Sequence, residues 1–284
     1  MKLLVTGAGG LLAREAIPAF ERAGHEVLGL SQADADVTRY EALTHPVRAF
    51  EPDWIVHLAA FTQVDDCETE PDRAFLVNAL GARHAALAAA ACGAGILVLS
   101  TDYVFDGESR VPYREYDPAR PRSVYGASKW AGEQAAREVH PRHLVIRSGW
   151  LFGAGGRNFV DTVLRRARAG EPLEIVDDQR GAPTWTRDLA EAMVRLVGAG
   201  LYGTYHVTNG GVCTWHELAA YVVARAGLRV EPQRTTTEAL GRAAPRPCYS
   251  VLNNQLYEHV TGARMPHWQD AVDRFLAIRA RADR

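Results

Sequence analysis

The chain has 284 residues, 47% hydrophobic and 23% charged, a composition typical of a protein that folds around one large or two modest cores. Its formal net charge is -2 and its arginines are spread along the whole length, so it has no basic patch of the kind that binds a phosphate backbone, and nucleic acid is not an expected partner. The four cysteines, Cys67, Cys92, Cys213 and Cys248, form no C-x-x-C pair, which indicates neither a disulfide framework nor a zinc site and favours reduced thiols.

No targeting or membrane-spanning segment is expected. The N-terminal run MKLLVTGAGGLLA contains a lysine and leucines, but Thr-Gly-Ala-Gly interrupts it too early for the apolar part of a signal peptide. No other segment is expected to be long and apolar enough to span a bilayer. A membrane is therefore not an expected partner, and a cytoplasmic location is predicted.

The first half of the chain alternates short apolar runs with longer helical patterns. The runs are rich in Val, Ile and Leu, which is typical of buried parallel strands. They lie at residues 2–6, 26–30, 53–60, 95–101 and 143–149. The clearest helix between them is the alanine-rich stretch 71–93, which ends at a glycine. This alternation predicts an α/β fold with a doubly wound, Rossmann-type parallel sheet.

The rhythm loosens after about residue 150, where stretches with Gly, Pro and Asn separate shorter helices. We expect residues 1–150 to form the dinucleotide-binding domain, with residues 180–207 returning to it. Residues 151–284 are expected to form mainly a smaller α/β substrate-binding domain. Within it, residues 270–284 are predicted to form a charged surface helix.

A glycine-rich turn, VTGAGGLLA, follows the first predicted strand and opens the first helix. At such a turn a nucleotide pyrophosphate rests on backbone N–H groups at the helix N-terminus. Gly7 and Gly10 keep the G-x-x-G spacing, and Ala13 occupies the third position, which needs only a small side chain for close packing. The place of this turn directly after a strand makes it a strong indication of dinucleotide binding.

The second predicted strand ends in LSQADAD, with no acid directly after it to hold a ribose 2′-hydroxyl. This absence favours NADPH, although no arginine is clearly placed for the 2′-phosphate, so NADH stays open. Asp36 comes later in the loop. It is predicted either to contact the adenine or to serve only as a loop or N-cap acid before the next helix.

The segment SVYGASK contains one of only two lysines in the chain, Lys129, the other being Lys2. Ser123 is a plausible N-cap, and Tyr125 and Lys129 lie on one face of the helix that follows because they are four residues apart. An ammonium beside a phenol stabilises the phenolate and is expected to lower the tyrosine pKa, which suits proton donation to a carbonyl oxygen. Arginine is a poor substitute, because it is not a compact point charge.

The fourth strand ends in LSTDYVFDG, which places Ser100, Thr101 and Asp102 at the carboxyl edge of the sheet, where ligands bind. A hydroxyl there can hydrogen-bond a substrate carbonyl and share its proton with Tyr125. We expect Thr101 to have this role. The alternative is a β-branched residue that only builds the strand.

These motifs resemble the extended short-chain dehydrogenase/reductase superfamily and, more closely, the dTDP-4-dehydrorhamnose reductase family. The resemblance covers nearly the whole chain, and its more specific blocks are TDYVFDG, DDQRGAPTW and RPCYSVLNN. It implies reduction of the C4 ketone of dTDP-4-dehydro-6-deoxy-L-mannose to dTDP-L-rhamnose by hydride from NADPH or NADH.

The resemblance also implies a set of site residues. Thr101, Tyr125 and Lys129 would be catalytic, with Lys129 also holding the nicotinamide ribose. Tyr103 and Trp150 match positions near the sugar, although Trp150 is as readily a buried core aromatic. Asn78 matches a structural asparagine, and Arg246 could meet the diphosphate but is more simply a surface arginine. The cofactor wall would comprise Gly7, Gly10, Leu11, Leu12, Asp36, Val37, Ala59, Ala60 and Thr62 together with Tyr125 and Lys129.

Some family features are missing or open. The glycine turn reads Gly-Gly-Leu-Leu-Ala where members often have Gly-Gln-x-Gly, so side-chain contacts to the pyrophosphate are lost while backbone contacts need not be. Some relatives bind magnesium at a dimer interface, and its acidic ligands cannot be placed here. We therefore predict no metal ligands, leave magnesium open, and regard a homodimer as compatible with the resemblance.

Three other functions compete with the reductase. A 4,6-dehydratase would carry Asp-Glu after the threonine, whereas this chain has Asp102-Tyr103, which argues against it. A 4-epimerase or another keto-sugar reductase shares Thr, Tyr and Lys and is harder to exclude. A regulatory subunit without catalysis, as in eukaryotic methionine adenosyltransferase, has the same fold, but the intact substrate-side blocks favour an enzyme.

Overall fold

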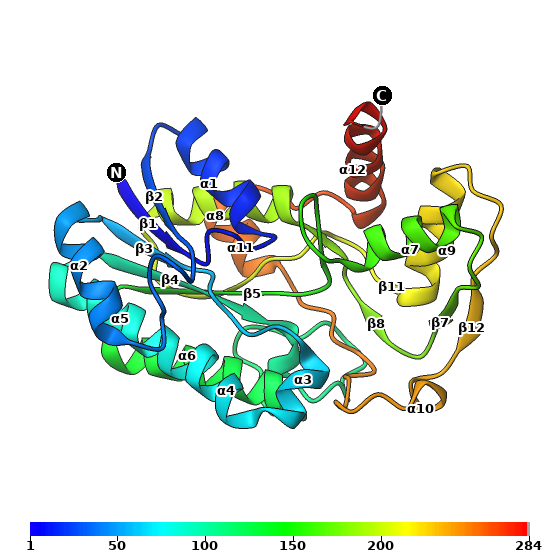
Figure 1. Cartoon of the computed structure of the whole chain (residues 1–284), viewed down its shortest axis with the longest axis horizontal. Coiled ribbons are helices and arrows are strands. Elements are labelled where there is room, and N and C mark those ends of the chain that lie inside the picture. Colours follow the sequence, from blue (N-terminus) through cyan, green and yellow to red (C-terminus); the bar gives the residue numbers. More distant parts are fainter. Residues whose placement is uncertain (283–284) are drawn as a thin grey trace.

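The computed structural model describes residues 1–282 of the chain, and its centre is a six-stranded sheet. The strands lie in the order β10-β5-β4-β3-β1-β2, and every neighbouring pair is parallel. The predicted doubly wound Rossmann-type fold is thus confirmed (Figure 1). The strands are β1 (Lys2–Thr6), β2 (Glu26–Leu30), β3 (Trp54–His57), β4 (Gly95–Thr101), β5 (His143–Ser148) and β10 (Gly203–His206).

Helices cover both faces of this sheet, because its strands are apolar on both sides. Two hydrophobic cores result, one on each face. The first face carries α1 (Ala13–Arg22), α8 (Thr186–Ala199) and α11 (Gln255–Thr261). The second carries α2 (Tyr40–Phe50), α4 (Pro71–Phe75), the π-helix η1 (Leu76–Leu80), α5 (Gly81–Cys92) and α6 (Val124–Val139), with the short α3 (Val64–Thr69) against α6.

A third core lies beyond the carboxyl ends of the strands, between α7 (Phe159–Arg168), α9 (Trp215–Arg225) and α12 (Trp268–Ala282). The last two residues of the predicted terminal helix, 283 and 284, lie outside the described part of the chain. The remaining short elements are η2 (Asp102–Val104), β6 (Leu151–Phe152), β7 (Glu174–Val176), β8 (Arg180–Gly181), β9 (Thr184–Trp185), β11 (Cys213–Thr214), β12 (Gln233–Thr235) and α10 (Thr237–Leu240).

The chain passes more than once between the six-stranded sheet with its covering helices and the part built around the third core. Strand β10 pairs with β5 at the edge of the large sheet, and α8 packs on α1. Helix α11 also contacts α8 and β10. The exact extent of the two domains stays a prediction.

The alanine-rich stretch 71–93 is one continuous helical segment with a π turn inside it, which the sequence pattern did not predict. It ends at Gly93, whose φ of 73° is the left-handed conformation that glycine adopts most easily. Contrary to the expectation above, Pro71–Cys92 is long and apolar enough by length and composition to cross a membrane. Its alanines instead pack between α2 and α6, and Ala82, Ala85 and Ala86 are fully buried.

Two predicted strands end earlier than expected. The run 53–60 is a strand only over Trp54–His57, and the run 143–149 only over His143–Ser148. The apolar residues that follow β3 leave the sheet and form the wall of a cavity instead. Apolar character alone therefore misplaced the strand ends, because a cavity wall is also apolar.

Candidate active site

The glycine-rich turn brings β1 close to the segment that follows β3. Gly7 has a φ of 72°, and a Cβ placed on it would lie 2.7 Å from the Ala59 nitrogen. Gly10 donates its backbone N–H to the Gly7 carbonyl oxygen at 2.9 Å. Helix α1 begins at the buried Ala13. Only a residue without a side chain fits at position 7, which explains why the turn needs its first glycine.

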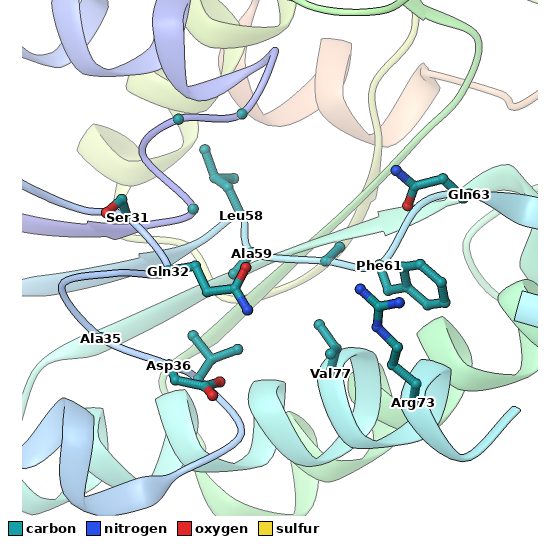
Figure 2. A pocket seen from close by; sticks show the side chains of 15 residues that line it. Ser31, Gln32, Ala35, Asp36, Leu58, Ala59, Phe61, Gln63, Arg73 and Val77 are labelled. Atoms are coloured by element: carbon teal, nitrogen blue, oxygen red, sulfur yellow. The ribbon is translucent and has the colours of Figure 1, made fainter. Parts of the chain in front are cut away.

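Two adjoining cavities run along this turn at the carboxyl edge of the sheet. The first, shown in Figure 2, lies beside the end of β2, and the second lies over the end of β4. Gly7, Gly10, Leu58 and Ala60 line both. All the sequence-predicted cofactor residues line one or the other: Asp36, Val37 and Ala59 the first, and Leu11, Leu12, Thr62, Tyr125 and Lys129 the second.

Asp36 lies at the wall of the first cavity but is bound within its own loop. Its carboxylate accepts hydrogen bonds from the Thr38 N–H at 3.0 Å and the Thr38 hydroxyl at 2.8 Å, and these bonds lower the pKa of Asp36. The side chain thus has a local structural role, and its contact with an adenine stays a prediction.

The three predicted catalytic residues line the second cavity together. Thr101 is the last residue of β4, and Tyr125 and Lys129 lie one turn apart near the start of α6. That helix begins where predicted, because the Ser123 hydroxyl accepts the Gly126 N–H at 3.1 Å. A Cβ on Gly126 would clash with the Tyr103 carbonyl oxygen, so this glycine lets the helix approach the segment that directly follows β4.

Lys129 is buried and Tyr125 is half-buried, with its phenol packed inside the site, and burial opposes the charged form of each. Burial raises the pKa of the Tyr125 phenol, and a hydrogen bond with Thr101 acts in the opposite direction. The lowered tyrosine pKa expected from the Tyr–Lys spacing is therefore not what this structure presents. Burial lowers the pKa of Lys129 to about 8, against the effect of the Glu133 carboxylate, and its ammonium donates to the Leu99 carbonyl oxygen at 2.6 Å.

Asp102 is a buried carboxyl group beside the predicted catalytic residues, and the sequence argument gave it no role of its own. It accepts a hydrogen bond from the Thr101 hydroxyl at 3.0 Å, and a Cβ on Gly149 would lie 2.5 Å from its carboxyl carbon. Burial raises the pKa of Asp102 to about 6, opposed by hydrogen bonds that include one from Ser250. In the sequence, the feature that could have indicated a role for Asp102 was its position directly after Thr101.

The two predicted sugar contacts also line the second cavity. The Tyr103 ring meets the Tyr125 ring edge-on at 5.8 Å between centroids. Trp150, with a φ of 52°, stacks on Trp215 at 3.5 Å between centroids, so it forms cavity wall more than core. The Trp215 indole N–H in turn donates to the Gln179 side chain at 3.0 Å.

Arg246 is not the surface arginine that the sequence favoured. Its side chain is only 15% exposed, and its guanidinium donates to both carboxylate oxygens of Asp65, at 3.0 and 2.8 Å. It lines a third cavity, which shares Tyr103, Phe159 and Trp215 with the second and continues between α7, β7 and α10. A pairing across so many residues could not be foreseen from local pattern.

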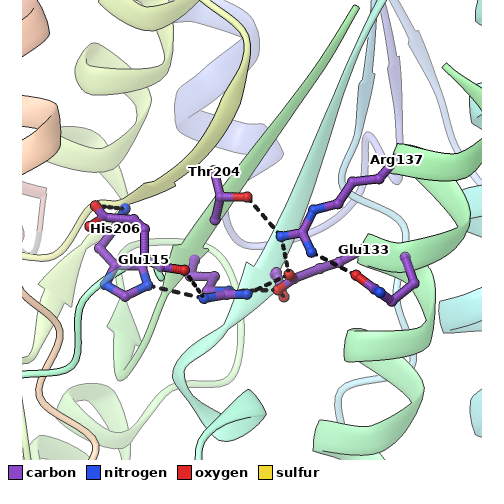
Figure 3. Close-up of polar contacts among 8 residues, drawn as sticks. Glu115, Glu133, Arg137, Thr204 and His206 are labelled. Carbon is purple, nitrogen blue, oxygen red and sulfur yellow. Dashed lines mark hydrogen bonds and ion pairs between the residues drawn. The ribbon is translucent and has the colours of Figure 1, made fainter. Parts of the chain in front are cut away.

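Two buried polar networks hold α6 in place. Asn78, from η1, accepts the Phe61 N–H at 2.8 Å and donates to the Phe61 carbonyl at 3.0 Å and the Ser128 hydroxyl at 2.9 Å. Behind the site, Glu133 of α6 binds Arg147 of β5, as Figure 3 shows. The Ser100 hydroxyl, next to Thr101, also donates to Glu133. Glu133 follows Lys129 by one helical turn, and this spacing could have indicated from the sequence that Glu133 lies near the site.

Within residues 1–282, no group of three or more His, Cys, Asp or Glu side chains lies so that it could hold a metal ion.

Comparison with known proteins relates this arrangement to one family. A family described as RmlD substrate binding domain matches residues 1–280. The chain is 44% identical to dTDP-4-dehydrorhamnose reductase of Streptomyces griseus, covering 99% of this chain and 95% of that one. It is 40% identical to a probable dTDP-4,6-dihydroxy-2-methyloxan-3-one 4-ketoreductase of Streptomyces antibioticus, covering 96% and 93%. The crystal structure of dTDP-4-dehydrorhamnose reductase from Bacillus anthracis in complex with NADP is similar with a TM-score of 0.95, at 36% identity over 98% and 99% of the two chains.

Proposed function

Because the chain belongs to the RmlD substrate binding domain family, we propose that it is an NADPH-dependent reductase that converts dTDP-4-dehydro-6-deoxy-L-mannose to dTDP-L-rhamnose. The resemblance inferred from the sequence motifs is confirmed at the level of the family. The observation that carries the proposal is that Thr101, Tyr125 and Lys129 line the same cavity as the glycine turn. The proposed proton donor, Tyr125, and the glycine turn proposed to bind the dinucleotide therefore line the same cavity.

The residues fit a nicotinamide dinucleotide. Gly9 lines the first cavity, and the space where its side chain would stand is open, so a pyrophosphate can approach the backbone of the turn. The adenosine end would lie in the first cavity, and the nicotinamide end beside Tyr125 and Lys129. The NADP complex of the Bacillus anthracis protein supports NADPH for this chain, with NADH as the alternative.

The bound dinucleotide supplies a hydride to the C4 carbon of the keto-sugar. Tyr125 donates its phenolic proton to the ketone oxygen, so that a C–H and an O–H bond form as the carbonyl π bond breaks. The Thr101 hydroxyl holds the same oxygen. Lys129 binds the nicotinamide ribose, and its positive charge steadies the phenolate that remains on Tyr125.

The sugar and its nucleotide are proposed to occupy the second and third cavities. Tyr103 and Trp150 bound the space next to Tyr125, where the sugar ring would lie. The third cavity combines apolar residues of β7 with Arg242 and Arg246. Apolar walls suit a pyrimidine base, and guanidinium groups suit a diphosphate.

The first test is loss of NADPH absorbance, and separately of NADH absorbance, when the purified protein meets dTDP-4-dehydro-6-deoxy-L-mannose prepared in situ from dTDP-glucose. We expect oxidation that depends on the keto-sugar. Tyr125→Phe should bind the dinucleotide as wild type does and lower kcat by about 10²-fold or more, since it removes the acid and not the binding surface. Unchanged turnover in this variant would refute the role of Tyr125.

The same assay separates the alternatives. Oxidation with a different keto-sugar and not with this one would favour another keto-sugar reductase, the class that the Streptomyces antibioticus relative represents. Interconversion of C4 epimers without net dinucleotide oxidation would favour an epimerase. Dinucleotide binding with no turnover of any keto-sugar would favour a regulatory subunit. A cytoplasmic location and a homodimer remain predictions, which fractionation and light scattering would test.

A further inference from the structure

The Thr101 hydroxyl lies among three polar groups, which together use every hydrogen-bonding position that it has. It accepts the Tyr103 N–H at 3.2 Å, its oxygen lies 3.0 Å from the Asp102 Oδ1, and it hydrogen-bonds the Tyr125 phenol. A hydroxyl has one hydrogen to donate and two lone pairs that accept. The direction of each bond at Thr101 therefore depends on which hydrogens its partners carry.

An ionised Asp102 directs these bonds away from a substrate. A carboxylate can only accept, so it takes the single hydrogen of the Thr101 hydroxyl. The Tyr103 N–H occupies one lone pair of the Thr101 oxygen, and the Tyr125 phenol must then donate to the other. In this state neither Thr101 nor Tyr125 has a hydrogen left for a ketone oxygen.

A protonated Asp102 reverses this pattern. Its carboxylic O–H can donate to the Thr101 oxygen across the same 3.0 Å contact, which fills the second lone pair. The Thr101 hydrogen is then released toward the cavity, and Tyr125 can no longer donate to Thr101. Both hydrogens become available to a ketone oxygen, as the proposed reduction requires.

The surroundings of Asp102 oppose its charge. The residue is only 3% exposed, and the absent side chain of Gly149 lets the backbone pack directly against the carboxyl group. Burial raises the pKa of Asp102 to about 6, so the neutral acid is populated close to neutral pH. The titratable side chains that face it are Tyr103 from η2 and Tyr125 from α6. Burial raises the pKa of both phenols, which therefore stay uncharged in this pH range.

The charged side chains of α6 near the site have other partners. Lys129 lines the same cavity, but its ammonium donates to a backbone carbonyl oxygen of β4 at 2.6 Å. Both carboxylate oxygens of Glu133 bind Arg147. On the remaining side, Ser250 contributes a hydroxyl and not a charge. These elements therefore give Asp102 no counter-ion that would hold it ionised.

We propose that Asp102 is a positioning residue that acts as a neutral carboxylic acid, turning the Thr101 hydroxyl toward the ketone oxygen and freeing the Tyr125 proton for transfer. This role rests on the proposed reduction and deepens it, because it sets the hydrogen-bond directions behind the two groups that meet the ketone. The proton that reaches the ketone still comes from Tyr125, and Asp102 keeps its own.

The first test is the pH dependence of kcat/KM for the keto-sugar at saturating NADPH. From pH ~6 to pH ~7.5, where Lys129 is still mostly charged, we expect the wild-type value to fall about tenfold or more as Asp102 ionises. Asp102→Asn places an N–H where the acid has its O–H and cannot ionise. Its kcat/KM should be lower than that of the wild type at pH ~6 but vary less than about twofold over the range.

Two further variants separate positioning from a general effect. Asp102→Ala offers Thr101 no donor at any pH, so kcat should fall about tenfold or more below that of Asp102→Asn across the range. Glu138→Gln, which removes an exposed carboxylate from α6, is the control and should keep the wild-type pH slope. An Asp102→Asn variant with the same pH slope as the wild type would overturn the inference.

Infrared difference spectra between the wild type and Asp102→Asn, recorded without a keto-sugar, give a measurement that does not depend on turnover. At pH ~5 the wild type should show the C=O band of a protonated carboxyl group that the variant lacks, and it should lose this band by pH ~8. Absence of the band at pH ~5 would overturn the inference. A wild-type protein that reduces no keto-sugar would overturn the proposed reaction, whereas the band would still decide whether Asp102 is a neutral acid.

Discussion

Replacing Glu133 by glutamine should destabilise the protein more than any other loss of one carboxylate on α6. Glu133 is fully buried, and both of its oxygens bind Arg147, at 2.9 and 2.8 Å. Arg137 donates to it at 2.9 Å and also binds Thr204 of β10 at 2.7 Å. One carboxylate therefore ties α6 to β5 through Arg147 and, by way of Arg137, to β10 (Figure 3).

The magnitude follows from what the substitution leaves behind. The Arg147 side chain is only 2% exposed, so Glu133→Gln leaves a buried guanidinium without its counter-ion. Removing one partner of a buried ion pair costs about 3–5 kcal/mol. The low end, about 3 kcal/mol, applies here, because Arg147 keeps a cation–π contact with Phe105 at 5.2 Å. At about 2–4 °C per kcal/mol for a chain of this size, the Tm should fall by roughly 6–12 °C.

Thermal and guanidinium unfolding of Glu133→Gln, followed by circular dichroism, would measure this effect. The matched control is Glu138→Gln on the exposed side of the same helix, which should change the free energy of unfolding by less than about 0.5 kcal/mol. If Glu133→Gln unfolded within about 2 °C of the control, the buried pair would not contribute as argued, and the reasoning would be refuted.

Three further predictions concern the same region. Tyr125→Phe at saturating dinucleotide should show a kcat loss with little change in KM for the keto-sugar, in steady-state kinetics. Gly149→Ala should lower both turnover and Tm, because its Cβ would lie 2.5 Å from the carboxyl carbon of Asp102 and must displace it from the site; normal values for both would contradict this contact. Acid should destabilise the fold: burial lowers the pKa of His57 and of His206 to about 3, so the folded state takes up fewer protons than the unfolded state. Their stabilisation is complete above pH ~6.5 and is lost toward pH ~3, at about 1.4 kcal/mol per pH unit each. Asp102, whose pKa is raised to about 6, acts in the opposite direction: as the pH falls from ~6 to ~4, it raises the free energy of unfolding by about 1.4 kcal/mol per pH unit. Together the three groups should therefore lower the free energy of unfolding by about 1.4 kcal/mol per pH unit in this range. Urea unfolding at stepped pH would measure this slope.

The sequence predicted well whatever depends on neighbours along the chain. The glycine turn, the N-cap at Ser123 and the shared face of Tyr125 and Lys129 each depend on a few consecutive residues, and the structure has all three. The alternation of strands and helices predicted the sheet for the same reason. The errors lay at strand ends, where the apolar run after β3 proved to be cavity wall.

Sequence by itself thus determined the fold class, the glycine turn and the shared helix face of Tyr125 and Lys129, because local backbone preference and periodicity govern them. Only the tertiary structure decided their environment. Burial, not the adjacent lysine, dominates the pKa of Tyr125, and Arg246 pairs with Asp65 from a distant segment. Such effects depend on which side chains exclude water together, and that is set by packing between segments that are far apart in the chain.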